Sequence, residues 1–400
     1  MTVLLWAVFQ TAGGGWADLH HPIWDEAATA LGPQLPIGRN SAISMDPTAG
    51  WTALLKLTAY GGIFWLATQL GRDRLRARQA VIATTVAAIA YSTYGLVVHF
   101  SGWDTILWMK KWAYLGDLTA TFVNRNAFGG YAGVGLLCCL ALAMHGLRPR
   151  EERRAHDLAE DLLVRAAPFI VGSLVIGLAL LLSHSRGALA ASLIGILTLV
   201  ACFAVGRLLR PKAAVVALAL IVAAGVVSFL LYGDGTLMRA LTANDEFADR
   251  ENLYRVVMAA IGDAPLTGFG LGSFPAVFAL YRDGTLLAPV TYEFAHSVHL
   301  ELLLELGWPA TALLYFAFAW ILGTCVAGLF RRQRDQLYPA IAIASAALLG
   351  AHGVVDFSVQ MPATAALLAL LLGVGYAQSW STGGHVAPSP AEQPFPASSG

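Results

Sequence analysis

The sequence predicts an all-α integral membrane protein, with about ten transmembrane helices and one large periplasmic loop that contains short helices. Three observations indicate this fold class: the composition, the lengths of the apolar runs and the spacing of the basic residues. Of the 400 residues, 57% are hydrophobic and 12% are charged. A soluble domain carries about 25% charged residues, so this low share favours a lipid bilayer as the solvent.

The apolar runs have the length of membrane-spanning helices, because about 20 residues of helix cross the hydrocarbon core. A tenth run, residues 1–12, is shorter than a span requires, and no basic segment precedes it as in a signal peptide. We therefore expect a curtailed first helix there. The full-length runs cover residues 51–71, 79–99, 126–146, 164–183, 188–206, 213–232, 308–330, 337–356 and 362–380.

Basic residues mark every second connection between these runs. Loops rich in Lys and Arg stay in the cytoplasm of a bacterial inner membrane, so we expect both termini inside and the other connections in the periplasm. The outward connections are then 13–50, 100–125, 183–187, 233–307 and 357–361. The inward set holds 15 of the 25 Lys and Arg residues: Arg72, Arg74, Arg76, Arg78, Arg148, Arg150, Arg153, Arg154, Arg165, Arg207, Arg210, Lys212, Arg331, Arg332 and Arg334.

The chain divides by composition into four parts. We expect N-terminal transmembrane helices over residues 1–232, a periplasmic loop over 233–307 and C-terminal transmembrane helices over 308–380. Residues 381–400 are rich in Pro, Ser and Gly, which is typical of a disordered tail, here cytoplasmic. No internal repeat is visible, and this disfavours a transporter built from inverted halves.

The composition also limits the chemistry. The net charge is zero, which gives no basic surface for a nucleic acid. All four cysteines lie inside apolar runs, as small hydrophobic residues do, and no zinc or redox motif occurs. We therefore expect neither a metal nor a cofactor.

Arg186 is the first candidate site residue, in the turn Ser183-His184-Ser185-Arg186-Gly187 between two apolar spans. A guanidinium at membrane depth stays charged, and its planar fork fits phosphate oxygens, so we expect an anion contact. The alternative is a polar turn whose arginine reaches the lipid headgroups. On the same predicted face, Arg125 and Asn126 are either substrate contacts or part of an ordinary helix cap.

The long outward loop holds the next candidates. A helical pattern begins near Asp249, with one apolar stripe of Leu253, Val257 and Ile261. Arg250 precedes this stripe and is either an anion contact or a surface partner of a neighbouring carboxylate, Glu246 or Asp249. The glycine-rich segment 265–274 does not match a dinucleotide fingerprint. It either brings backbone close to a bulky ligand or forms a plain turn.

Ionisable groups also flank the last outward turns. His296 precedes the helix that carries Glu301 and Glu305, and an imidazole can accept a proton near neutral pH. We expect a catalytic or substrate-contacting role for His296, with a structural histidine as the alternative. His352 and Asp356 are four residues apart and could pair on one helical face, either for function or as a buried structural pair.

Taken in chain order, these motifs resemble the O-antigen ligases and the related polysaccharide polymerases. The resemblance covers about residues 50–380 and is strongest from Arg250 to Gly307. Tyr254 stands where the family commonly has tryptophan, Ser297 stands where it has asparagine, and relatives usually carry more membrane helices. The motifs are Asn124-x-Asn126, Ser183-x-Ser185-Arg186-Gly187, Arg250-x-x-x-Tyr254, Pro265-x-x-Gly268-x-Gly270-x-Gly272-x-Phe274, Ala295-His296-x-x-x-Leu300, Glu305-x-Gly307 and His352-x-x-x-Asp356-Phe357.

The resemblance implies a metal-independent membrane glycosyltransferase whose donor is a glycan on undecaprenyl diphosphate. By position, Arg186 and Arg250 match the family's essential arginines, and His296 matches its essential histidine. The arginines would hold the diphosphate, and the histidine would assist attack by an acceptor hydroxyl. The other expected substrate contacts are Arg125, Asn126, Tyr254, Arg255, Glu305 and Asp356.

The acceptor distinguishes several functions that share this donor chemistry. We favour a ligase that transfers the O-antigen to lipid A-core, because the region of Arg250 and His296 is more similar to that branch. A polymerase acting on a growing glycan and a protein O-oligosaccharyltransferase are the alternatives. A transporter would need polar residues in mid-span or broken helices, whereas mid-span positions here are mostly Ala, Leu, Val and Ile. A structural scaffold would not need the outer arginines and histidine.

Overall fold

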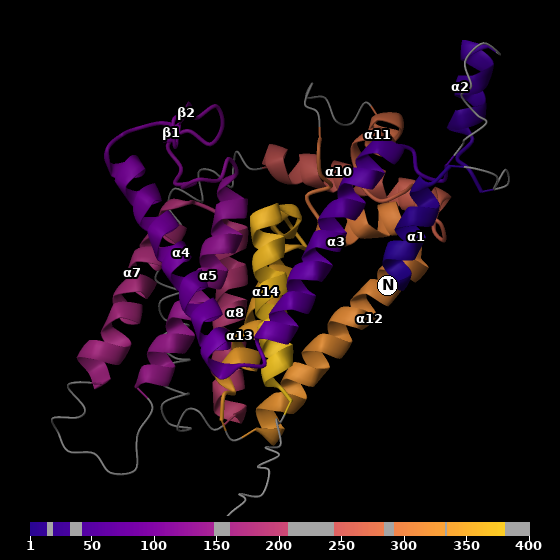
Figure 1. The fold of residues 1–400 in the computed structure, drawn as a ribbon. Coiled ribbons are helices and arrows are strands. Elements are labelled where there is room, and N and C mark those ends of the chain that lie inside the picture. Colours follow the sequence, from indigo (N-terminus) through magenta and orange to yellow (C-terminus); the bar gives the residue numbers. More distant parts are fainter. Residues whose placement is uncertain are drawn as a thin grey trace, which may run out of the picture.

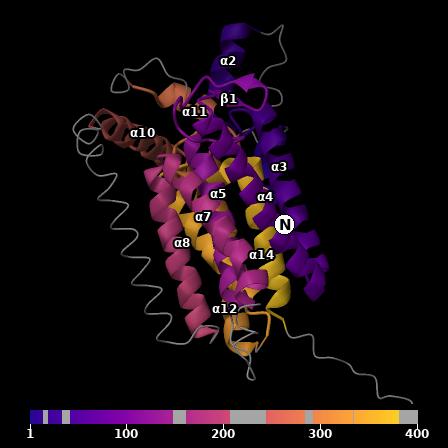
Figure 2. The same ribbon diagram turned by 90° about the vertical axis from the view of Figure 1, so that its left-hand side faces the viewer.

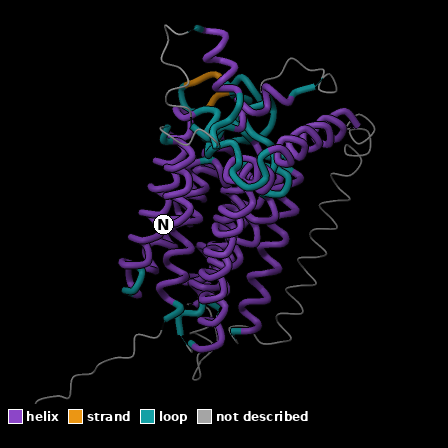
Figure 3. Tube along the Cα trace, turned by 90° about the vertical axis from the view of Figure 1, so that its right-hand side faces the viewer, coloured by secondary structure: helices purple, strands orange, loops and turns teal. Residues whose placement is uncertain are grey.

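The computed structural model describes residues 1–13, 19–32, 42–147, 161–206, 244–283, 292–332 and 334–380. Long helices run side by side as a bundle, and short helices and a hairpin gather at one end of it (Figure 1). Loops and turns concentrate at that same end (Figure 3). We call it the loop end, and we call the other end the basic end. The all-α class predicted from the sequence is confirmed over the described residues.

The described helices follow one another with few other elements between them. The only strands in the described ranges, β1 (Thr105–Ile106) and β2 (Met109–Lys110), form an antiparallel hairpin in which Thr105 pairs with Lys110. A π-helical turn, η1 (Asp161–Ala166), and a 3-10 turn, η2 (Ser358–Gln360), complete the described set. The α-helices are α1 (Thr2–Thr11), α2 (Ile23–Leu31), α3 (Pro47–Leu70), α4 (Arg74–Phe100), α5 (Arg125–Gly146), α7 (Ala167–Leu182), α8 (Arg186–Val205), α10 (Asn244–Asp263), α11 (Phe274–Tyr281), α12 (Val298–Arg331), α13 (Leu337–His352) and α14 (Pro362–Gln378).

The helices are those of a multi-pass membrane protein. Five described helical segments, rather than about ten, are both long and apolar enough to cross a bilayer: Arg74–Phe100, Arg125–Gly146, Val164–Leu182, Arg186–Val205 and Val298–Arg331. The apolar helices α1, α13 and α14 are shorter, and α3 has the length but a less apolar composition. The predicted span 213–232 lies outside the described residues.

The predicted boundaries at residues 308 and 356 both lie at the loop end. Helix α12 begins at Val298, as expected of a helix that carries Glu301 and Glu305, and its kink at Gly307 falls where the predicted apolar span begins. Helix α13 ends at His352 rather than at residue 356. The backbone N–H of Val298 donates to the carbonyl of Gly353 at 2.9 Å, which joins the start of one helix to the end of the other.

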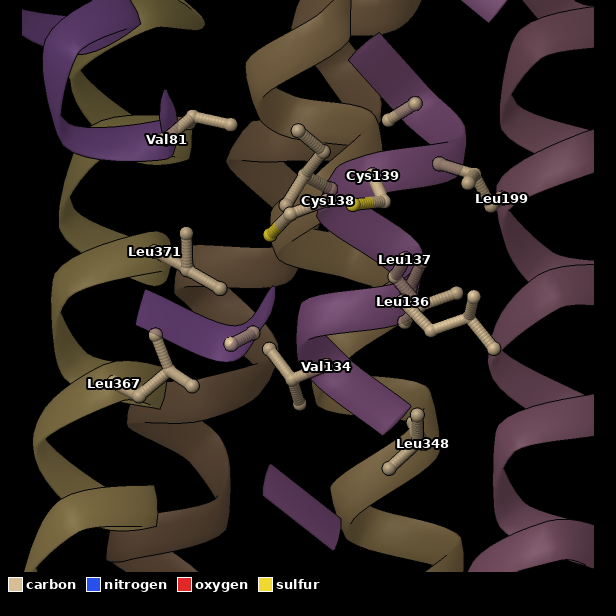
Figure 4. Packing of buried hydrophobic residues seen from close by; sticks show 14 of the residues in the cluster. Val81, Val134, Leu136, Leu137, Cys138, Cys139, Leu199, Leu348, Leu367 and Leu371 are labelled. Atoms are coloured by element: carbon tan, nitrogen blue, oxygen red, sulfur yellow. The ribbon is translucent and has the colours of Figure 1, made fainter. Parts of the chain in front are cut away.

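Helix α5 forms the centre of the bundle. Its side chains lie among α4, α8, α13 and α14, as Figure 4 shows for Val134, Leu136 and Leu137. A methyl group on Gly135 would lie 2.3 Å from the Cβ atom of Ala88, so only glycine allows α4 to approach this closely. Cys138 and Cys139 are buried here as free thiols, which agrees with the predicted role of the cysteines as small hydrophobic residues.

Helix α12 bends sharply at Gly307, whose φ of 75° is not helical. Pro309 has no N–H, so it cannot donate to the carbonyl of Glu305 as a helical residue would. The N–H of Trp308 also leaves the helix and donates to Pro265 at 2.8 Å. The bend therefore frees carbonyls inside the helix, and each buried carbonyl needs another donor.

The glycine-rich loop and α1 supply those donors. The N–H groups of Phe269 and Gly270 donate to the carbonyls of Leu304 and Glu305, each at 2.9 Å. The Gln10 amide reaches the carbonyl of Glu305 at 2.8 Å, and the Trp6 indole reaches that of Leu306 at 3.0 Å. The carbonyl groups at the bend thus accept hydrogen bonds from two segments that are distant in sequence.

The glycines of this loop are needed for protein packing. Gly268, Gly270 and Gly272 all have positive φ values, which favour glycine. A Cβ atom on Gly268 would lie 2.4 Å from the carbonyl oxygen of Glu305, and one on Gly270 would lie 2.5 Å from Ser44. Of the two sequence interpretations, close backbone approach applies, but the described neighbour is the protein itself.

The basic end collects the described arginines of the predicted inward connections. Arg74, the first residue of α4, forms an ion pair of 2.7 Å with Asp335, and Arg332 lies 3.5 Å from the same carboxylate. The start of α4 and the connection after α12 therefore lie together. The helices that start at Arg125, Arg186 and Val298 begin at the opposite, loop end (Figure 1), as the predicted alternation requires.

Candidate functional site

The candidate site lies at the loop end, where α5, α8 and α12 begin and α13 ends. Helix α10 lies across this end and reaches beyond the side of the bundle formed by α8 (Figures 1 and 2). The site residues predicted from the sequence come from five stretches of the chain. The structure joins some of them by direct hydrogen bonds, gives others different partners within the protein, and leaves Arg186 and Arg250 without a described partner.

Asn126 and Asp356 are joined in one hydrogen-bond chain. The hydroxyl of Ser185 donates to Asn126 Oδ1 at 2.7 Å, and Asn126 Nδ2 donates to Asp356 Oδ2 at 2.7 Å. The hydroxyl of Ser358 donates to the other carboxylate oxygen, Oδ1, at 2.9 Å. Asp356 is 1% exposed, so this chain holds a buried carboxylate between α5, α8 and the turn before α14.

Arg125 contacts a different carboxylate, which the sequence analysis missed. Its guanidinium lies 2.8 Å from Asp117 Oδ2, and it sits over the ring of Tyr114 at 5.5 Å. His184 Nδ1 lies 2.8 Å from the other oxygen, Asp117 Oδ1. Asp117 therefore joins the starts of α5 and α8. In the sequence, Asp117 is distinguished only as one of two acidic residues in the connection 100–125.

The backbone around His296 is fixed by its neighbours. The Tyr254 hydroxyl donates to the carbonyl of His296 at 2.9 Å, and the N–H of Ala295 donates to Glu301 Oε2 at 2.7 Å. Gln360 donates to the other oxygen of the Glu301 carboxylate. His296 itself has a φ of 52°, a left-handed conformation that a histidine rarely adopts. Such strain persists only where surrounding contacts enforce it.

The imidazole of His296 lies among aromatic rings. Its centroid is 5.0 Å from that of Phe357 and 6.4 Å from that of Tyr292, both edge to face. Its Nδ1 atom is buried and accepts or donates no hydrogen bond within the described chain. Burial lowers the pKa of His296, the Asp356 carboxylate raises it and the Arg250 guanidinium lowers it. The lowered pKa favours the neutral ring, which can accept a proton.

Arg250 and Arg186 are cations without described anionic partners. Arg250 is half-buried on α10, one helical turn before Tyr254, and it acts electrostatically on both Tyr254 and His296. Arg186 is exposed at the first turn of α8, where the Ser185 side chain caps the helix. Neither side chain forms an ion pair or hydrogen bond with the parts of the chain that the structure describes. Helix α10 starts at Asn244, so Arg250 lies inside the helix and not at its start.

Other predicted contacts have partners within the protein. Arg255 forms an exposed ion pair of 2.9 Å with Asp283. The Glu305 side chain is buried and accepts from the N–H of Phe274 at 3.2 Å, at the start of α11. Tyr254 positions His296 through the carbonyl described above. The substrate contacts predicted for these residues stay predictions.

His352 lies beside the hydrogen-bond chain, and the possible pair with Asp356 has no hydrogen bond within the described residues. Both ring nitrogens of His352 are buried without a hydrogen-bond partner in the described chain. The ring fits because two glycines border it: a Cβ atom on Gly130 would lie 3.1 Å from Nδ1, and one on Gly187 would lie 3.4 Å from Nε2. This contact explains the glycine that follows Arg186.

The arrangement combines a neutral base with cations that have no described partner. Arg186 and Arg250 can hold a negatively charged group, and guanidinium groups suit phosphate oxygens. The His296 imidazole can accept a proton, and the Asp356 carboxylate favours the protonated ring. Within the described ranges, no group of three His, Cys, Asp or Glu side chains is placed to hold a metal ion.

Comparison with known proteins agrees with the motif order. No curated protein matches the chain. Residues 171–315 match the model of a protein family described as O-Antigen ligase. The matched segment contains Arg186, Arg250 and His296, whereas Arg125, Asn126 and Asp356 lie outside it. The segment 171–315 is thus an O-Antigen ligase family region, which confirms the predicted resemblance over those residues.

Proposed function

We propose that the chain is a membrane glycosyltransferase that moves a glycan from undecaprenyl diphosphate to an acceptor hydroxyl, and that it acts as an O-antigen ligase on lipid A-core. The loop end then faces the periplasm of a bacterial inner membrane, because the basic end carries the arginines that remain in the cytoplasm. The observation that carries this proposal is a set of groups without described partners, Arg186, Arg250 and His296 Nδ1, at one end of the bundle.

The reaction transfers one glycosyl group without redox chemistry. The acceptor oxygen attacks the anomeric carbon of the donor sugar, and the bond from that carbon to the diphosphate breaks. The electron pair leaves with the diphosphate, whose growing negative charge Arg186 and Arg250 stabilise. The hydroxyl proton passes to His296, and Asp356 stabilises the imidazolium that results.

Two further assignments follow from the geometry. Asn126 holds Asp356 in place through its amide, so it serves the site as a positioning residue. Tyr254 does the same for the backbone of His296. Arg125 and Arg255 each already contact a carboxylate of the protein, so they can bind substrate only if the substrate replaces that carboxylate.

Polymerisation is the main alternative, since the family match covers the donor chemistry and not the acceptor. A gel of lipopolysaccharide and of lipid-linked glycan, from cells with and without the gene, separates the two functions. A ligase leaves long glycan on undecaprenyl diphosphate and bare lipid A-core when the gene is absent. A polymerase leaves single repeat units on the core. An unchanged pattern in both pools contradicts both functions.

The residue assignment is tested in the same cells with Arg186→Ala, Arg250→Ala and His296→Ala. Each variant is expected to abolish transfer while its level in the membrane stays normal. Arg76→Ala is the matched control, because Arg76 is exposed at the basic end. Normal transfer in all three site variants removes the proposed site.

A further inference from the structure

A cavity lies under the β1–β2 hairpin at the loop end, outside the hydrogen-bond chain of Asp356. Its volume is about 190 Å³, which is room on the order of six water molecules. The end of α4, the hairpin and the segment 116–120 form its walls. The hairpin is held over α4 by the N–H of Leu107, which donates to the Tyr94 hydroxyl at 2.6 Å.

The cavity is lined by a buried ammonium group. Lys111 is 6% exposed and donates to the backbone carbonyl of Asp117 at 2.6 Å. An ammonium group has three N–H donors, so two of them lack a partner within the described residues. A ligand in this cavity can accept hydrogen bonds from these two donors in place of water.

Acceptors lie beside these donors. The Asp104 side chain is exposed and lines the cavity, and Asp117 lines it as well. The charge of Asp117 is already balanced by Arg125, at 2.8 Å. The remaining charged groups of the wall are thus one cation and one carboxylate, which together disfavour an anionic ligand and suit a neutral one with many hydroxyl groups.

An aromatic ring completes the wall. Trp103 lines the cavity and is 62% exposed, so one part of its surface is open to a ligand. The apolar face of a sugar ring packs on an indole, while the sugar hydroxyls both donate and accept hydrogen bonds. A volume well below the roughly 300 Å³ of a small drug site restricts the occupant to about one sugar unit.

The cavity is connected to the candidate site through Asp117. Its backbone carbonyl binds Lys111, while its carboxylate binds Arg125 and His184 at the starts of α5 and α8. We propose that this cavity is a glycan subsite that binds one sugar unit of the transferred or the accepting glycan, with Trp103, Asp104 and Lys111 as its contacts. The inference rests on the proposed function and names a binding site for it.

The test measures binding without turnover. The purified full chain in lipid nanodiscs is titrated by calorimetry with two probes: core oligosaccharide released from lipopolysaccharide, and repeat-unit oligosaccharide released from the lipid carrier. Trp103→Ala and Asp104→Asn are each expected to weaken binding of one probe at least tenfold. Trp108→Ala is the matched control, because Trp108 is 85% exposed on the same hairpin but does not line the cavity.

The two probes distinguish the source of the sugar. If the cavity variants bind only the core probe more weakly, the cavity belongs to the acceptor. If they bind only the repeat-unit probe more weakly, it belongs to the donor. Binding that is unchanged in both cavity variants overturns the inference, as does an equal loss in Trp108→Ala. Gels from cells that carry these variants report transfer separately, so sugar binding that is unchanged in both cavity variants rejects the subsite and leaves the proposed function standing.

Discussion

Replacement of Asp356 by asparagine tests both the hydrogen-bond chain and the base. In the native chain, Asn126 Nδ2 donates to one carboxylate oxygen and the Ser358 hydroxyl donates to the other. The substituted amide keeps one oxygen that accepts from Asn126, and its N–H can donate to the Ser358 hydroxyl, which then donates to the Asn126 carbonyl at 3.1 Å. The hydrogen bond from Asn126 to a charged oxygen becomes one to a neutral oxygen, so we expect the free energy of unfolding to fall by about 1 kcal/mol.

The exchanged pair should recover most of this loss. With Asp356→Asn and Asn126→Asp together, the asparagine amide donates to the new carboxylate, and Ser185 and Ser358 keep their acceptors. The new carboxylate also lies in the first turn of α5, where a negative charge is favourable by about 0.3–1 kcal/mol. Thermal unfolding of the purified proteins in nanodiscs measures both effects. A single variant as stable as the native protein, or an exchanged pair no better than the single variant, would refute the hydrogen-bond chain.

The same substitution changes the pH dependence of the reaction. The Asp356 carboxylate raises the pKa of His296 against the effect of burial, so its removal lowers that pKa further. The base is active when neutral, and the transfer rate falls as the pH drops through its pKa. We therefore expect the acid limb of kcat/KM against pH to move to lower pH in Asp356→Asn, measured with a soluble acceptor analogue. A limb that moves to higher pH contradicts the assignment of His296 as the base.

Three further predictions concern the cations, the bend and the loop that meets it. Arg250→Gln removes a charge that lowers the pKa of His296, so the rate of His296 modification by diethyl pyrocarbonate should fall at pH 6, and an increase would contradict this coupling. Gln10→Leu removes two amide donors, to Thr267 at 2.6 Å and to Glu305 at 2.8 Å, and should lower the free energy of unfolding by about 1–3 kcal/mol, measured in nanodiscs. Gly307→Ala places a Cβ atom 2.4 Å from the carbonyl oxygen of Leu266 at a φ of 75°, so little folded protein should reach the membrane. Its control, Gly262→Ala, fills open space on α10 and should keep normal levels; equal levels in both variants would contradict the steric argument.

The lengths of the apolar runs and the spacing of the basic residues predicted many of the helices in the bundle. The helices expected at 79–99, 126–146 and 188–206 appear with bounds within a few residues, because each depends mainly on a long run of apolar side chains. The kink in α12 at Gly307 could not be predicted in this way. The turns before it carry Glu301 and Glu305, and the partners Ala295, Gln360 and Phe274 make a buried helix with these carboxylates stable.

The sequence singled out candidate site residues by type but did not indicate their contacts. Arg186, Arg250 and His296 were chosen for their expected place on one outer face and their match to family motifs, and their roles stay predictions. No pattern in the sequence indicated that Asn126 would donate to Asp356, 230 positions away in the chain. Asp117 was missed for the same reason, since its partners Arg125 and His184 become neighbours only when α5 and α8 pack together.

The side chains at the loop end fall into two groups: those that hydrogen-bond to protein groups, and those with no described hydrogen-bond partner. Glu301, Glu305 and Asp356 are buried carboxylates that accept from protein donors, so each stabilises the fold around the site. Arg250 and the His296 imidazole differ, because they lie on or before helices fixed by such contacts and yet have no described hydrogen-bond partner of their own. In the proposed reaction, a frame that leaves cations and a base open to a ligand stabilises the charge that develops, since these groups need not reorganise when the diphosphate leaves.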